Sequence, residues 1–135
     1  MKNLALLLII SGCFIVFACN KTDKSERFKL LTGPIWTTDS LLANGVNASG
    51  DPIIGKFKGD AKFKEDGSGY FGIYTGTWRF NQDETEITIV TDSLILPIIS
   101  DIVELTSSSF KITTVVPDKD NPMQPINIRM TFKAR

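Results

Sequence analysis

The sequence contains no histidine and only two cysteines, and its opposite charges cancel. Without imidazole, the chain can form neither a Ser-His-Asp triad nor a histidine-ligated metal site. Fifteen basic side chains face fifteen acidic ones, so the net charge offers no electrostatic reason to expect nucleic-acid binding. A length of 135 residues and a hydrophobic content of 42% are typical of one folded domain.

The first eighteen residues form a pattern that predicts an export signal. Lys2 precedes an apolar run from Leu4 to Ala18, which is shorter than the ~20 residues that a membrane-spanning helix needs. Its length suits the apolar core of a signal peptide, and it is followed by a polar segment, residues 20–27. An uncleaved N-terminal anchor helix is the alternative.

The end of this run, Val16-Phe17-Ala18-Cys19, resembles the lipobox of bacterial lipoproteins, in which the cysteine becomes the lipidated first residue. Cys13 is the alternative site, but it would leave an apolar stretch just after the cleavage point. We therefore predict a signal peptide over 1–18, acylation of Cys19 by a lipid such as palmitate, and a tether over 19–28. The resemblance implies an exported protein of the cell envelope, held by its lipid anchor at the outer membrane. Loss of both thiols from the folded domain excludes disulfides, thiolate nucleophiles and cysteine-based zinc sites there.

The rest of the chain alternates apolar and polar residues with a period of two, which predicts β-strands. The clearest case is residues 126–133. The stretch 93–105 also fits helical spacing, but Pro97 and many β-branched residues favour two strands that meet near Ser100 and Asp101. The predicted strands are roughly 34–43, 54–64, 69–80, 85–91, 93–99, 101–106, 109–116 and 125–134.

About eight consecutive strands joined by short turns indicate an all-β, up-and-down antiparallel barrel over residues 29–135. Closing such a meander removes its exposed edges. At this strand number, the interior holds packed side chains or one small ligand.

Three motifs resemble the lipocalin-like lipoproteins of Bacteroidota. They are the opening Leu31–Trp36, the Asp-Gly turn in Phe63–Ser68 and the segment Gly76–Phe80. The resemblance covers about residues 30–134 and implies a lipocalin-like barrel. Trp36 lies one residue farther from its glycine than in the Gly-x-Trp of classical lipocalins.

Aromatic side chains are the candidate ligand contacts of such a barrel: Trp36, Tyr70, Tyr74 and Trp78. The alternative is that they fill the core. Gly72 and Gly76 alternate with the tyrosines, so they either leave space on the same face or mark strand bends.

Other short motifs carry less information. Asp118, Asp120 and Asn121 begin like a calcium loop but lack its glycine and closing glutamate, which favours a solvated turn. Ser40 and Ser93 lie in Asp-Ser-aliphatic sequences that resemble O-glycosylation sites of exported Bacteroidota proteins.

The combined pattern predicts a monomeric, membrane-tethered module that binds a small apolar or amphipathic ligand. We expect no catalytic residues, metal or cofactor, and no nucleic-acid partner. The alternative is a structural or protein-interaction lipoprotein with a packed barrel, whose loops 44–52 and 117–122 contact a partner. An internal cavity of about 300 Å³ or more would favour ligand binding over that alternative.

Overall fold

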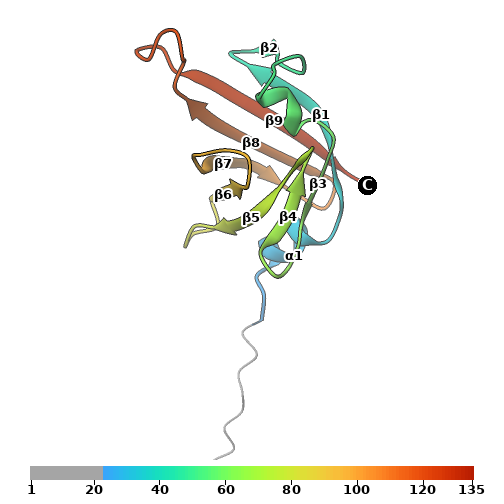
Figure 1. The fold of residues 1–135 in the computed structure, drawn as a ribbon. Coiled ribbons are helices and arrows are strands. Elements are labelled where there is room, and N and C mark those ends of the chain that lie inside the picture. Colours follow the sequence, from blue (N-terminus) through green and yellow to red (C-terminus); the bar gives the residue numbers. More distant parts are fainter. Residues whose placement is uncertain (1–22) are drawn as a thin grey trace, which may run out of the picture.

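The computed structural model describes residues 23–135 (Figure 1). The predicted signal segment, Cys13 and Cys19 lie outside these residues. The described chain consists of one short α-helix, one 3₁₀ turn and a series of strands. In chain order they are α1 (Glu26–Thr32), β1 (Trp36–Ala43), β2 (Val46–Asn47), η1 (Ile54–Phe57), β3 (Asp60–Phe63), β4 (Ser68–Phe71), β5 (Tyr74–Phe80), β6 (Glu86–Thr91), β7 (Ile98–Leu105), β8 (Ser109–Val116) and β9 (Ile126–Ala134).

The strands form a closed antiparallel barrel. From β3 to β9 each strand pairs with the next, and β1 pairs with both β3 and β9. The β1–β9 ladder runs from Trp36 opposite Ala134 to Ala43 opposite Ile128, whereas β1 meets β3 only through Trp36 and Thr37. Since β2 is only a two-residue partner at the end of β1, eight strands close the ring. The predicted all-β, up-and-down barrel is confirmed.

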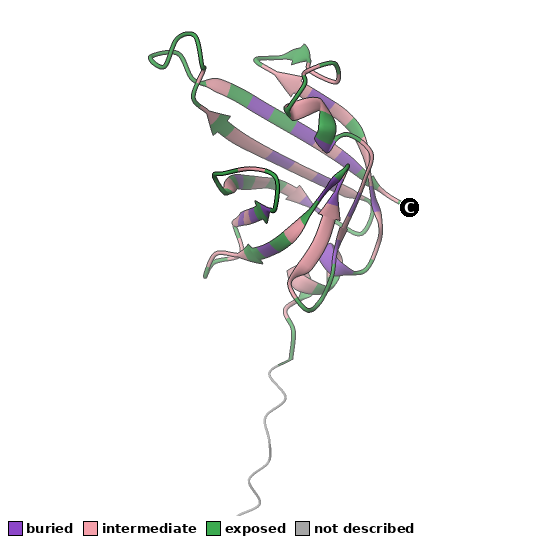
Figure 2. Cartoon of the chain, viewed as in Figure 1, coloured by how far each residue is buried: buried purple, intermediate pink, exposed green. Residues whose placement is uncertain are grey.

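Side chains alternate between the interior and the surface along the strands (Figure 2). In β9, Ile128, Met130 and Phe132 are buried, as the period-two pattern predicts. In the centre of the core, Phe63 makes edge-to-face contacts with Trp78 and Phe110, with ring centroids 5.6 and 5.7 Å apart.

Two predicted strands are interrupted by turns. The segment predicted as strand 54–64 begins as the 3₁₀ turn η1, and Asp51 Oδ1 accepts hydrogen bonds from the backbone N–H groups of Ile53 and Ile54, both 2.8 Å. The segment predicted as strand 69–80 reverses at Gly72, whose φ of +60° suits glycine. It therefore forms two strands, β4 and β5, instead of one.

The ambiguous region 93–105 contains one strand rather than two. Residues 92–97 form a loop that ends at Pro97, and β7 runs without a break through Ser100 and Asp101. Proline lacks the N–H that a paired strand residue donates, so pairing can start only after it. The prediction of strands over 93–99 and 101–106 is wrong in this respect.

The helix α1 was not predicted, and it begins inside the segment 19–28 that we expected to act as a tether. Ser25 caps it, because its side chain accepts a hydrogen bond from the Phe28 N–H at 3.0 Å. Leu31 is fully buried, and the Phe28 ring lies 5.6 Å from that of Trp78. The helix thus closes one end of the barrel, which we call the helix end. No helix within residues 23–135 is long and apolar enough to cross a membrane.

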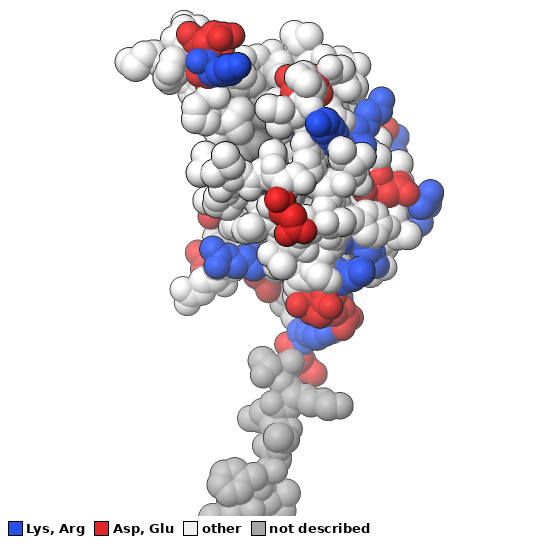
Figure 3. Space-filling model, viewed as in Figure 1, with Lys and Arg blue, Asp and Glu red and all other residues white. Residues whose placement is uncertain are grey.

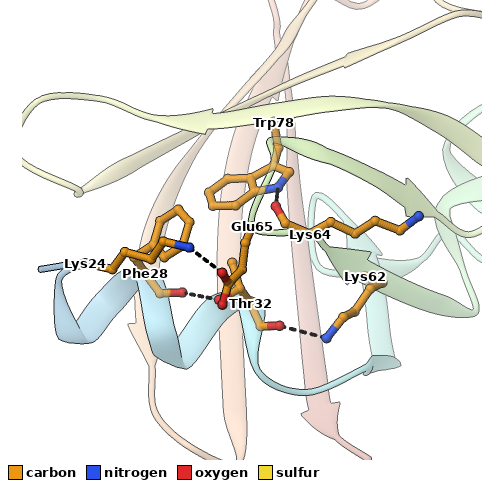
Figure 4. Close-up of polar contacts among 7 residues, drawn as sticks. All are labelled: Lys24, Phe28, Thr32, Lys62, Lys64, Glu65 and Trp78. Carbon is orange, nitrogen blue, oxygen red and sulfur yellow. Dashed lines mark hydrogen bonds and ion pairs between the residues drawn. The ribbon is translucent and has the colours of Figure 1, made fainter. Parts of the chain in front are cut away.

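Polar contacts hold α1 in place (Figure 4). Lys62 Nζ donates to the carbonyl oxygens of Thr32, Gly33 and Pro34 at 2.7, 2.8 and 3.1 Å, just where the helix leaves carbonyls without partners. On the other side, Lys24 pairs with Glu65 of the β3–β4 turn. Hydrogen bonds from Lys62 and the ion pair of Lys24 therefore hold the helix segment against β3 and the β3–β4 turn, in addition to apolar packing.

Candidate ligand-binding cavity

The half of the barrel farther from α1 contains a cavity of about 600 Å³. Antiparallel pairing places the loops after β1, β4, β6 and β8 at the end opposite α1, which we call the open end. The cavity is lined by inward side chains of β3, β4 and β6–β9, by η1 and by the β6–β7 loop. Ala61, Phe63, Met130 and Phe132 line it, and no lining residue is charged.

The cavity reaches the surface where two neighbouring strands separate. β7 and β8 pair only between Asp101–Leu105 and Phe110–Thr113. Nearer the open end, β7 pairs only with β6, and β8 pairs only with β9. A single side-chain hydrogen bond, from Thr114 Oγ1 to the Ile99 carbonyl, links the two strands there. The barrel wall is therefore incomplete beside the cavity.

The β6–β7 loop, Asp92–Pro97, borders this gap with apolar side chains. Leu94 packs against the core, whereas Ile95 is 100% exposed and Leu96 is 72% exposed. Figure 3 shows mostly uncharged atoms below the charged tip of the β8–β9 loop on this face, with one acidic group near the centre of the view. An apolar molecule would thus meet apolar side chains at the entrance as well as inside.

None of the four aromatic residues proposed from the sequence lines the cavity. Trp36 and Trp78 are buried at the helix end, where their indole N–H groups donate to the carbonyls of Leu31 and Lys64, both at 2.9 Å. They fill the core and anchor α1 and the β3–β4 turn. The tryptophans fill the half of the barrel at the helix end, and the free volume lies in the other half.

The two tyrosines lie on opposite faces of the sheet, because the chain reverses between them. Tyr74 is buried; its ring contacts that of Phe57 at 4.5 Å and its hydroxyl donates to the Ile53 carbonyl at 3.3 Å. Tyr70 is the partner of exposed Thr75, so it faces outward. Tyr74 therefore packs against Phe57, which lines the cavity, whereas Tyr70 faces away from the barrel interior.

Gly72 and Gly76 do not create the free space. A Cβ atom on Gly72 would lie 2.1 Å from the Lys56 carbonyl oxygen, and one on Gly76 would lie 1.9 Å from that of Val90. Both glycines allow another segment of backbone to approach closely. Of the two interpretations left open by the sequence, the unfilled gap is therefore wrong: Gly72 lies at the reversal of the chain, as the alternative of a strand bend predicts, and Gly76 lies against the backbone of Val90.

The lining residues that the sequence analysis missed are those of the β6–β7 loop and the start of β7. The apolar run Leu94-Ile95-Leu96 ending at Pro97 was the available signal, because exposed apolar side chains grouped in a loop often mark a binding site. Ser93, a predicted glycosylation site, is exposed at the cavity entrance, and Ser40 is half-buried in β1.

The charged groups with shifted pKa values lie away from the cavity. Hydrogen bonds from Ser68 lower the pKa of Asp66 in the β3–β4 turn, and those from Ser109 and Lys111 lower the pKa of Glu104. In the β8–β9 loop, Asp118 accepts from the Asp120 N–H at 2.8 Å, as in a solvated turn. Within residues 23–135, no three His, Cys, Asp or Glu side chains gather where they could hold a metal ion.

Comparison with solved structures finds a likeness in fold. The complex of bovine odorant binding protein with a selenium-containing odorant is similar to this chain, with a TM-score of 0.48 and 14% sequence identity over 84% of this chain and 75% of that chain. Searches of protein-family models and of curated proteins find no match for the chain. The strand pairing itself defines the class: an eight-stranded, up-and-down antiparallel barrel with an apolar cavity in one half.

We expect Trp78→Phe to weaken the fold but not ligand binding. The substitution leaves the Lys64 carbonyl without its donor and removes part of a packed indole, which costs about 1–3 kcal/mol of unfolding free energy. Urea unfolding measures that loss. The affinity for the apolar fluorophore N-phenyl-1-naphthylamine should stay within about twofold.

Tyr70→Phe is the control, since Tyr70 faces outward and does not line the cavity. It should change neither the unfolding free energy nor the affinity. A severalfold loss of probe affinity in folded Trp78→Phe would instead place the indole in the ligand site.

Proposed function

We propose that this protein binds a small apolar or amphipathic molecule inside the barrel. The observation that carries the proposal is the cavity of about 600 Å³ without a charged lining residue. This volume falls within the roughly 300–1,000 Å³ of typical small-molecule sites. Each Å² of apolar ligand surface removed from water would contribute about 25 cal/mol. The proposed function is binding alone, with no bond-making step.

The cavity favours this function over a packed interaction barrel. A barrel that serves only as a scaffold gains stability from a filled interior, because empty volume loses packing contacts. Here large side chains fill the helix end, while Ala61 occupies a buried cavity position on β3. The free volume, together with the gap between β7 and β8, supports a ligand site with its own entrance.

We also propose that the chain is a monomeric lipoprotein, exported by residues 1–18 and anchored through acylated Cys19 in the cell envelope, at the outer membrane. The folded domain supports this arrangement in one respect. Helix α1 starts at Glu26, so the six residue steps from Cys19 to Ser25 span at most about 20 Å. The anchor would therefore hold the helix end toward the lipid and turn the open end away from it.

A charge placed in the cavity wall tests the binding function. Ile98 lies at the start of β7 and lines the cavity. We expect Ile98→Asp to weaken binding of N-phenyl-1-naphthylamine at least about tenfold at pH 7, because an apolar ligand would strip water from the new carboxylate. Fluorescence titration measures the dissociation constant, and circular dichroism checks the fold.

Val103→Asp is the matched control, because Val103 is 63% exposed on the same strand. Its affinity should equal that of the unaltered protein. Equal binding by both folded variants, or no binding by the unaltered protein, would contradict a ligand site in this cavity.

Anchoring is tested separately in cells. Cys19→Ser should move the protein from the membrane fraction to the soluble fraction, because the acylated residue is lost, while Cys13→Ser should leave it in the membrane fraction. Fractionation with immunoblotting measures the distribution. Continued membrane association of Cys19→Ser would contradict the assignment of the anchor.

A further inference from the structure

One polar side chain is buried in the wall of the cavity without a partner. Ser100 on β7 is 1% exposed and borders the cavity. Its hydroxyl oxygen has no hydrogen-bond partner in the described part of the chain. A buried hydroxyl that loses its hydrogen bonds to water is unfavourable unless something replaces them, so this group calls for an explanation.

The surroundings of Ser100 explain why its hydroxyl finds no hydrogen-bond partner in the protein. Its partner on β6 is Ile87, which is fully buried, and the preceding inward residue on β7 is Ile98. On the other side, β8 has already separated from β7. The nearest hydroxyl of β8 along this gap, that of Thr114, donates to the Ile99 carbonyl. The Ser100 hydroxyl is thus left among apolar side chains beside the free volume.

The other polar lining residues serve the entrance rather than the interior. Ser93 is exposed in the β6–β7 loop, and Thr114 holds β8 to β7. With no cation in the lining, a ligand carboxylate would lose its hydration without gaining a counter-ion. A ligand amine would face the same cost. The interior thus offers one hydrogen-bonding position and disfavours charge.

Resting on the proposed function, we propose that the ligand is an uncharged molecule with an apolar body and one hydrogen-bonding oxygen, as in a long-chain alcohol or ketone, and that this oxygen bonds to the hydroxyl of Ser100. Ser100 then sets the specificity of the site, because its hydrogen bond favours a ligand with a neutral oxygen over a hydrocarbon. The apolar lining favours the same neutral ligand over a carboxylate.

The test compares three ligands that share a ten-carbon chain: decane, decan-1-ol and decanoate at pH 8. Each displaces N-phenyl-1-naphthylamine from the full-length protein, from Ser100→Ala and from the control Ser107→Ala, whose serine is exposed in the β7–β8 turn and does not line the cavity. We expect decan-1-ol to bind the unaltered protein at least about tenfold more tightly than decanoate. Ser100→Ala should weaken decan-1-ol binding about three- to tenfold, the equivalent of one hydrogen bond, and leave decane binding unchanged. Ser107→Ala should match the unaltered protein.

The stability of the empty protein gives a second readout. Removing a lone buried hydroxyl should leave the urea midpoint of Ser100→Ala equal to or higher than that of the unaltered protein. A clearly lower midpoint would show that the hydroxyl already has a partner in the empty barrel and would overturn the proposal.

The binding outcomes separate the two proposals. If all three ligands bind but Ser100→Ala leaves the preference for decan-1-ol unchanged, or if decanoate binds as tightly as decan-1-ol, the role of Ser100 is overturned and the binding function stands. If neither the fluorophore nor any of the three ligands binds the unaltered protein, the binding function itself fails and the role of Ser100 fails with it.

Discussion

The backbone ladder between β1 and β9 is the interaction on which the rest of the structure depends. It joins the first long strand to the last, from Trp36 opposite Ala134 to Ala43 opposite Ile128. Because it joins the two ends of the sheet, the inward side chains face one another instead of water. Without this ladder, the apolar residues that line the cavity would form one exposed face of an open sheet.

Inside the closed ring, the distribution of large side chains decides where free volume remains. Trp36, Trp78 and Phe110 gather toward the helix end, and α1 adds Leu31 to them, while Phe63 contacts Trp78 and Phe110 and also lines the cavity. The strand ends near the open end carry mostly aliphatic residues, and β7 and β8 separate there. The same barrel is therefore a packed core at one end and holds the cavity at the other, and α1 leads into β1 at the packed end.

The fold class could be predicted because period-two alternation reports directly which side of a strand is buried, as in Ile128, Met130 and Phe132. Turns that interrupt an alternating segment could not be predicted in this way. The reversal at Gly72 depends on a backbone conformation that the residue pattern does not reveal, and it places Tyr70 and Tyr74 on opposite faces. Helix α1 was missed because a seven-residue segment between a polar stretch and a barrel owes its stability to the contacts of Phe28 and Leu31 with the core rather than to its own periodicity.

The candidate site escaped the sequence analysis for a related reason. Aromatic residues suggested a ligand site, but in this barrel their size fills the interior, and their N–H groups are used to hold α1 and the β3–β4 turn. Free volume remains where a lining side chain is small, as at Ala61, and where β7 and β8 stop pairing. A periodic pattern of apolar residues reveals neither feature. A crystal structure determined under xenon pressure tests the central claim most directly, because xenon enters apolar cavities. The account predicts xenon bound near Ile112 and Met130 inside a ring closed by β1 and β9. An interior filled by side chains, with xenon only outside the barrel, would contradict it.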